Sequence, residues 1–255
     1  MGDYVLFHMW EPLRRSLIKG QQFYVEQATK RLLSQFTDME AEADKASAAW
    51  LEERAPYFDP NRHDPGDFYE AAHDAGIEFY QMLSDLRVQT LLSVVGGMYH
   101  EWDKQLRKWI VHEVGRWHTG LVATDELWRV DFEKMMDFLD SLGWAVRSRD
   151  HYPRLDACRL VVNVYKHGNG NSLNTLRSRY PDYLRGPFEG WLSDALTRHL
   201  DYTHLELTYE QCVAFSDAII AFWEAVPEQT TASQVTDLPV WFVKAIEKDR
   251  RATHL

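Results

Sequence analysis

The sequence predicts an all-α fold, a helical bundle with two very long antiparallel helices. Residues 13–55 and 67–116 both repeat apolar side chains at the 3.6-residue period of an α-helix. The stretch between them contains Asp59-Pro60 and Asp64-Pro65-Gly66, which favour turns over helix. Because a short connection places consecutive helices antiparallel, we expect residues 13–115 to form a long helical hairpin.

Shorter helical patterns follow this hairpin. We expect residues 124–250 to form the helices that carry the candidate motif. The sequence shows no internal repeat and no low-complexity tract, so we expect residues 1–255 to form a single mainly helical domain. The first twelve residues mix aromatics with a proline and predict an irregular lead-in. The shorter helices are expected at residues 124–142, 153–167, 173–180, 209–226 and 240–250.

Three local signals refine this outline. Gly96-Gly97 lies within the second long helix and predicts either a kink or a close crossing of another helix. Thr208-Tyr-Glu-Gln211 has the spacing of a capping box and predicts a helix start. Residues 204–207 alternate enough to predict a short extended piece.

The composition restricts the classes of function. Asp and Glu number 39 against 28 Lys and Arg, and a net charge of −11 argues against a protein that coats DNA through general basicity. A local basic groove on an acidic body remains compatible with this charge. Cys158 and Cys212 lie far apart outside any metal-binding spacing, and no apolar run is long enough to cross a bilayer. We therefore expect a cytoplasmic protein with no membrane partner.

Several enzyme classes find little support in the sequence. Paired Glu-x-x-His motifs are typical of di-iron helical bundles, but only Glu70-Ala-Ala-His73 has this spacing, and a solvated helix face explains it as well. The chain has no Gly-x-Ser-x-Gly elbow, and Gly168-Asn-Gly170-Asn-Ser172 lacks the lysine of a phosphate-binding loop. We expect no metal and no cofactor.

The candidate site is the stretch Arg159 to Ser172, where polar side chains interrupt an apolar helical pattern. Arg159, Asn163 and His167 are spaced four residues apart and therefore share one stripe of a helix. Gly168 and Gly170 then end that helix. A histidine at a helix C-terminus, with an amide one turn back and a cation two turns back, fits an acid/base or phosphate-contacting group. The alternative is that Lys166 and His167 only cap the last carbonyls.

Other basic side chains are candidates for binding a substrate. Lys166 lies beside His167 in the sequence, and Arg177 and Arg179 follow in the next short helix. The second long helix carries a polar stripe, which is either an opposing wall of the site or a solvated face with paired charges. The candidate residues of this stripe are His100, Asp103, Lys104 and Arg107.

Asn163-Val-Tyr-Lys166-His167-Gly168, at a helix end in an all-α chain, resembles the motif of the HEPN superfamily. Active members of that superfamily carry Arg-Asn followed by three residues and His. Asn163 and His167 match the motif's Asn and His, whereas the position of the motif's Arg is Val162. The chain is also similar to bacterial helical proteins with Asn-x-x-Lys-His-Gly at a helix end.

The resemblance implies a HEPN-like fold and metal-independent RNA cleavage in a homodimer, in which one chain supplies half of the site. His167 would be the acid/base and Asn163 its orienting partner. Arg159, Lys166 or Arg177 would replace the missing arginine. The expected partners are RNA and a second copy or another protein, in bacterial defence or toxin–antitoxin function.

Two alternatives remain open from the residues. The first is a non-catalytic interaction or sensor subunit, which Val162 and the acidic net charge favour. The second is a helical scaffold whose Ala- and Glu-rich hairpin docks a partner, with the motif serving only as a helix cap. The clustered cations around His167 favour a site that faces nucleic acid.

Overall fold

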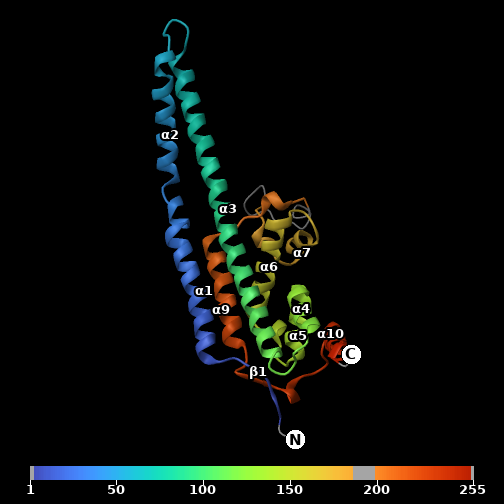
Figure 1. Ribbon diagram of the computed structural model, residues 1–255. Coiled ribbons are helices and arrows are strands. Elements are labelled where there is room, and N and C mark those ends of the chain that lie inside the picture. Colours follow the sequence, from blue (N-terminus) through green and yellow to red (C-terminus); the bar gives the residue numbers. More distant parts are fainter. Residues whose placement is uncertain (1–2, 186–198, 254–255) are drawn as a thin grey trace. The chain divides into compact units, whose positions relative to one another are not determined.

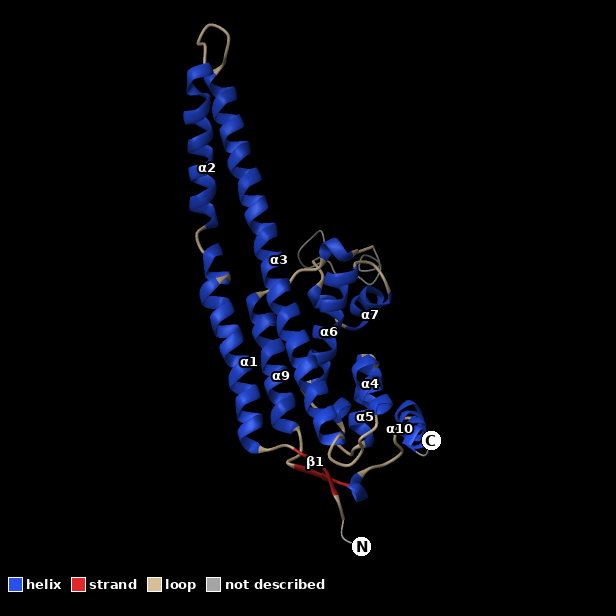
Figure 2. Cartoon of the chain, in the orientation of Figure 1, coloured by secondary structure: helices blue, strands red, loops and turns tan. Residues whose placement is uncertain are grey.

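The computed structural model describes residues 3–185 and 199–253, and helices form nearly all of their regular structure (Figures 1 and 2). This confirms the all-α prediction. The chain divides into two compact units. The main unit comprises residues 1–25 and 95–255, and the hairpin unit comprises residues 26–94. The expectation that residues 1–255 behave as one domain stays a prediction.

In the hairpin unit, α2 (Met39–Arg54) lies antiparallel to the first part of α3 (Pro65–Val114), as Figure 1 shows. The rings of Trp50 and Phe68 meet edge to face with centroids 5.9 Å apart. Ser47 Oγ donates a hydrogen bond of 2.8 Å to the carbonyl of Ala72. A Cβ on Gly76 would lie 2.2 Å from that hydroxyl oxygen, so the two helices approach closely because residue 76 has no side chain.

The second long helix is confirmed, because α3 runs unbroken for 50 residues. The expectation of one helix over residues 13–55 is wrong: α1 (Glu11–Arg31) ends before a short 3₁₀ helix, η1 (Leu33–Phe36), and α2 begins anew. Ser34 Oγ bonds the carbonyl of Lys30, and Thr37 Oγ1 bonds the carbonyl of Ser34. Hydroxyls that bond nearby carbonyls compete with the helical ladder, which explains the break.

The main unit contains the last turns of α3 and the helices of the C-terminal half. Trp102 of α3 is 1% exposed and meets Phe222 edge to face at 5.2 Å in the core. The expected capping box is confirmed, since Thr208 and Gln211 exchange side-chain and backbone hydrogen bonds. The helices are α4 (Leu121–Arg129), α5 (Phe132–Ser141), α6 (Tyr152–His167), α7 (Asn171–Arg179), α9 (Tyr209–Ala225) and α10 (Val240–Thr253).

The expected helix over residues 124–142 is in fact two helices. The side chain of Asp131 accepts a hydrogen bond of 2.9 Å from the N–H of Lys134 and so caps a new helix, α5. Because Asp131 adopts an extended backbone as the N-cap of α5, the helix cannot continue from α4 through this residue. The remaining 3₁₀ turns are η2 (Ala55–Tyr57), η3 (Val146–Ser148), η4 (Pro181–Tyr183), η5 (Tyr202–His204) and η6 (Ala232–Gln234).

The lead-in, expected to be irregular, contains a strand. β1 (Val5–His8) pairs antiparallel with β2 (Gln229–Thr231), a partner more than 220 residues away in sequence. Phe7 is 1% exposed and packs its ring 6.2 Å from that of Trp109, and the N–H of His8 donates to Glu113 at 2.8 Å. Pairing over such a separation leaves no local signal, so the sequence pattern missed this strand. In the predicted extended piece, Leu205 bridges to Leu184.

The glycine pair of α3 allows a close crossing and does not break the helix. A Cβ on Gly97 would lie 2.4 Å from the hydroxyl oxygen of Tyr24 on α1, whereas Gly96 has nothing within 4 Å. The close approach of α1 therefore requires a glycine at position 97 only.

Candidate functional site

The C-terminal end of α6 presents two basic side chains to solvent. Lys166 and His167 are both exposed and lie in the last helical turn, where positive charge is favourable beside the free carbonyls. Gly168 has a φ of +70° and donates its N–H to the carbonyl of Val164 at 2.8 Å, which ends the helix. Within residues 3–185 and 199–253, neither basic side chain forms a hydrogen bond or ion pair. Both remain free to contact a ligand.

The motif's other positions are less accessible. Val162, which occupies the position of the motif's arginine, is 2% exposed and belongs to the core. Asn163 is half-buried on the same stripe as His167, but no hydrogen bond joins the two side chains in the described part of the chain. An arginine in place of Val162 would have to displace core packing.

Arg159, the first candidate for the missing cation, is engaged elsewhere. Its Nε donates to Asp156 at 3.1 Å, and its Nη2 donates to Glu133 of α5 at 3.1 Å. The guanidinium also lies 4.9 Å from the ring centroid of Phe132. Eight residues separate Arg159 from His167, which corresponds to about 12 Å along the helix axis. The structure therefore does not bring these two predicted residues together.

Asp156 is a buried carboxylate that sequence reasoning missed. It is completely buried in α6, where Arg159 and Arg179 contact different oxygens of the carboxylate. Arg179 Nη1 lies 3.0 Å from Oδ2, and the hydroxyl of Tyr180 donates to the same oxygen at 3.1 Å. Burial, together with the charge of Asp156, raises the pKa of Tyr180 to about 12. The only sequence signal was the spacing of Asp156 and Arg159, three residues apart on a helix.

Arg177, the other candidate replacement, also has partners. Its Nε donates to the carbonyl of Leu200 at 2.6 Å, and its Nη1 donates to Asn174 at 3.0 Å. Arg177 thus ties α7 to the segment that precedes η5. Of the predicted cations around His167, Arg159, Arg177 and Arg179 bind other parts of the chain, and Lys166 remains exposed.

The predicted polar stripe on α3 is largely paired. His100 is exposed, and Lys104 pairs with Glu101 at 2.7 Å. Arg107 is buried, donating to Asp103 at 2.8 Å and to the carbonyl of Leu127 in α4 at 2.7 Å. These contacts give Arg107 a role in holding α4 against α3.

The segment around η5 lies against the end of α6. Tyr202 is about half exposed, and a Cβ on Gly168 would lie 3.7 Å from its ring. The N–H of Tyr202 donates to the side-chain oxygen of Asn169 at 3.1 Å. An exposed aromatic ring therefore lies beside the residue that follows His167. Sequence reasoning missed Tyr202, because only the tertiary fold places it there.

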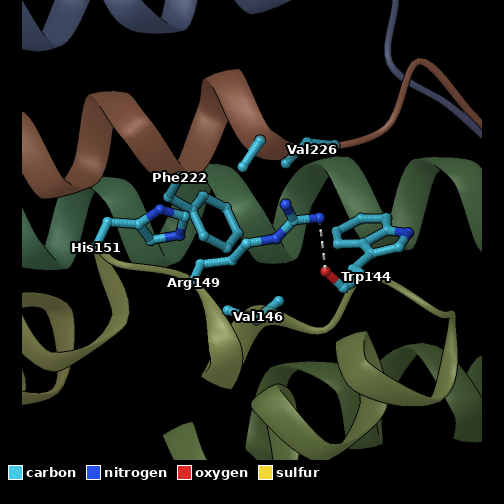
Figure 3. Close-up of a pocket in the computed structure, with 7 residues that line it drawn as sticks. Trp144, Val146, Arg149, His151, Phe222 and Val226 are labelled. Atoms are coloured by element: carbon cyan, nitrogen blue, oxygen red, sulfur yellow. Dashed lines mark hydrogen bonds between the residues drawn. The ribbon is translucent and has the colours of Figure 1, made fainter.

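A small cavity lies at the opposite end of α6, about 24 Å along the helix from His167. Its volume is about 10 Å³, which is the space of roughly one water molecule. Figure 3 shows His151, Arg149, Trp144 and Phe222 around it, with Arg149 donating to the carbonyl of Trp144 at 3.3 Å. His151 is 9% exposed, and its Nε2 is buried without a hydrogen-bond partner among the described residues. Burial, reinforced by the charge of Arg149, lowers the pKa of His151.

The cysteines are poorly placed for nucleophilic chemistry. Cys158 and Cys212 are both buried. Burial raises the pKa of the Cys158 thiol well above its usual value and that of Cys212 to about 11. A protonated, inaccessible thiol is a weak nucleophile. Residues 3–185 and 199–253 contain no group of three or more His, Cys, Asp or Glu side chains that could hold a metal ion.

No protein-family model matches this chain, and neither a curated protein nor a solved structure matches it. The resemblance to the HEPN superfamily therefore stays a prediction carried by residues 163–168. No described helix is long and apolar enough to cross a membrane.

Proposed function

We propose that this protein binds RNA at the C-terminal end of α6 and acts there as a HEPN-like, metal-independent endoribonuclease when two copies bring two such ends together. The observation that carries the proposal is the exposed His167 imidazole, which follows the exposed Lys166 in the last turn of α6 and has no partner in the described chain. The biological setting in this proposal is bacterial defence or toxin–antitoxin function.

The chemistry needs one proton acceptor, one proton donor and a cation. A base removes the proton of a ribose 2′-OH, the 2′-oxygen attacks the adjacent phosphorus, and the bond from phosphorus to the 5′-oxygen breaks while an acid protonates that oxygen. The products are a cyclic phosphate and a 5′-hydroxyl. One α6 end supplies one imidazole, so the proposal assigns the second proton-transfer group to the His167 of a second copy. Lys166 supplies the positive charge that stabilises the phosphorane.

The N-terminus of α7 adds to the phosphate-binding character of this region. Gly170 is its N-cap, and no side chain caps the helix. The first N–H groups of a helix attract anions. They follow His167 by only four residues in sequence, and the proposal places the same phosphate between the imidazole and these donors.

A non-catalytic RNA-binding or sensor subunit is the second candidate. Two observations favour it: Val162 is buried at the arginine position, and Arg159 is engaged by Asp156 and Glu133. In this case the α6 end would bind the ribose–phosphate backbone without cleaving it.

The deciding experiment incubates the purified protein with single-stranded and structured RNA in EDTA and measures both binding and the formation of cyclic-phosphate ends. His167→Ala is the test variant. His73→Ala is the matched control, because His73 is also an exposed histidine of a helix and lies in the hairpin unit. Cleavage that His167→Ala abolishes and His73→Ala preserves supports the nuclease. Binding without cleavage supports the second candidate, and the absence of both refutes an RNA function.

A further inference from the structure

We propose that Tyr202 is a stacking platform for an unpaired RNA base, beside the phosphate contacts of His167 and Lys166. The inference rests on the proposed RNA binding and names the part of the RNA that the site recognises. The ring of Tyr202 lies against Gly168, and the Cα atoms of Gly168 and His167 are about 3.8 Å apart as chain neighbours. An exposed aromatic ring therefore lies beside the residue that directly follows the exposed His167.

The ring is accessible, although the backbone behind it is held firmly. Tyr202 is 51% exposed, so about half of its surface is open to a ligand. Its N–H donates to Asn169 at 3.1 Å, and the carbonyl of Leu200 accepts from Arg177 at 2.6 Å. The segment is thus held at the tyrosine by the α6–α7 loop and two residues before it by α7.

The other end of η5 is fastened as well. The carbonyl of His204 accepts the N–H of Arg185 at 2.8 Å, and Asp201 caps the turn by accepting the N–H of Thr203 at 3.0 Å. A platform fixed before binding loses little conformational entropy when a ligand arrives. These contacts give Arg177 a positioning role in the site, different from the direct substrate contact expected from the sequence.

The charges around the ring favour a nucleotide over an uncharged aromatic ligand. Proteins that bind single strands combine cations that follow the backbone with aromatic faces on which bases stack. Here Lys166 and His167 form the last turn of α6, and the Tyr202 ring lies against Gly168, the next residue. Asp201 directly precedes Tyr202 in the chain. The Asp201 carboxylate already accepts a hydrogen bond from the N–H of Thr203, and its Oδ1 lies 2.9 Å from Nδ1 of the His204 ring. We assign the base to the tyrosine ring and the phosphate to the α6 end, because a phosphate beside Asp201 would be repelled.

This assignment predicts a preference for unpaired RNA. A base within a duplex is stacked between its neighbours and cannot lie flat on a side chain without being extruded. A loop or a single strand offers its bases without this cost. Tyr202 would therefore distinguish single-stranded from double-stranded RNA, while Lys166 would contribute to the binding of both.

The test uses the full-length chain in EDTA with a short single-stranded oligoribonucleotide that carries 2-aminopurine, and the same strand annealed to its complement. Fluorescence quenching reports stacking, and anisotropy reports affinity. The variants are Tyr202→Ala and Tyr202→Trp. Tyr69→Ala is the matched control, since Tyr69 is an exposed tyrosine of the hairpin unit.

We expect Tyr202→Ala to weaken single-strand binding by roughly five- to a hundredfold and to abolish the quenching. Tyr202→Trp should retain both, and Tyr69→Ala should change neither. Unchanged affinity and quenching in Tyr202→Ala would overturn the platform while leaving RNA binding intact. Equal binding of duplex and single strand by the unmodified protein would also overturn it. No RNA binding by the unmodified protein would overturn both this inference and the proposed function.

Discussion

Replacing Asp156 by alanine should destabilise the main unit by about 3–5 kcal/mol, the range for removing one partner of a buried ion pair. The carboxylate is completely buried and accepts hydrogen bonds from Arg159, Arg179 and Tyr180. Without it, the Arg159 side chain, which is 15% exposed, retains Glu133 as its one carboxylate partner within residues 3–185 and 199–253. Arg179 is 56% exposed and can turn to water, so the stranded charge of Arg159 dominates the cost.

Thermal unfolding followed by circular dichroism measures this effect. For a unit of this size, 3–5 kcal/mol corresponds to a fall in Tm of roughly 6–20 °C. Asp137→Ala is the control, because Asp137 is 57% exposed and pairs with Arg147 at 2.9 Å on the surface. Surface pairs contribute about 0–1 kcal/mol, so the control should lose at most about 4 °C. Equal shifts for the two variants would refute the reasoning that Asp156 holds this part of the fold.

Burial lowers the pKa of His151 below its usual 6.5, so the unfolded chain takes up the proton at a higher pH than the folded chain does. The free energy of unfolding should therefore fall as the pH drops below about 6.5. Urea titrations at several pH values should show that His151→Gln flattens this dependence. Gly120→Ala should lower the free energy of unfolding by about 1–3 kcal/mol in urea titrations. The new Cβ would lie 2.0 Å from Asp249, whose carboxylate accepts hydrogen bonds from the first N–H groups of α4. A Cβ on Gly96 would meet nothing within 4 Å, so Gly96→Ala should instead stabilise α3 by about 0.5–1 kcal/mol. Equal effects of Gly120→Ala and Gly96→Ala would contradict the geometry. Lys166→Ala should weaken RNA binding and reduce the slope of log affinity against log salt by about 0.7, and an unchanged slope would remove Lys166 from the phosphate contacts.

The sequence predicted the helical elements where the signal was local. The apolar period identified α3, and Gly168 marked the end of α6, because both features depend on neighbours within one or two turns. The prediction of helices from the sequence failed where side-chain hydroxyls compete with the backbone hydrogen bonds of a helix. Ser34 and Thr37 bond nearby carbonyls and end the first helical run, although the apolar period continues across them.

The same division applies to the candidate site. Periodicity correctly placed Asn163 and His167 on one stripe at the end of a helix, since four residues make about one turn. It also suggested Arg159 as a partner of His167. The structure instead directs Arg159 to Asp156 and to Glu133, and the latter is 26 residues away in sequence. The direction of a long side chain is decided by the charges that surround it, which the helical period does not specify.

The sequence by itself determined an all-α chain with a basic helix end at Lys166 and His167. Only the tertiary structure decided which cations remain available there and which aromatic ring lies beside them. Arg177 and Tyr202 illustrate the difference, because their contacts join α6, α7 and η5 across 23 to 33 residues of chain. Helix formation follows from interactions between near neighbours, whereas the surroundings of a site depend on which distant segments pack together.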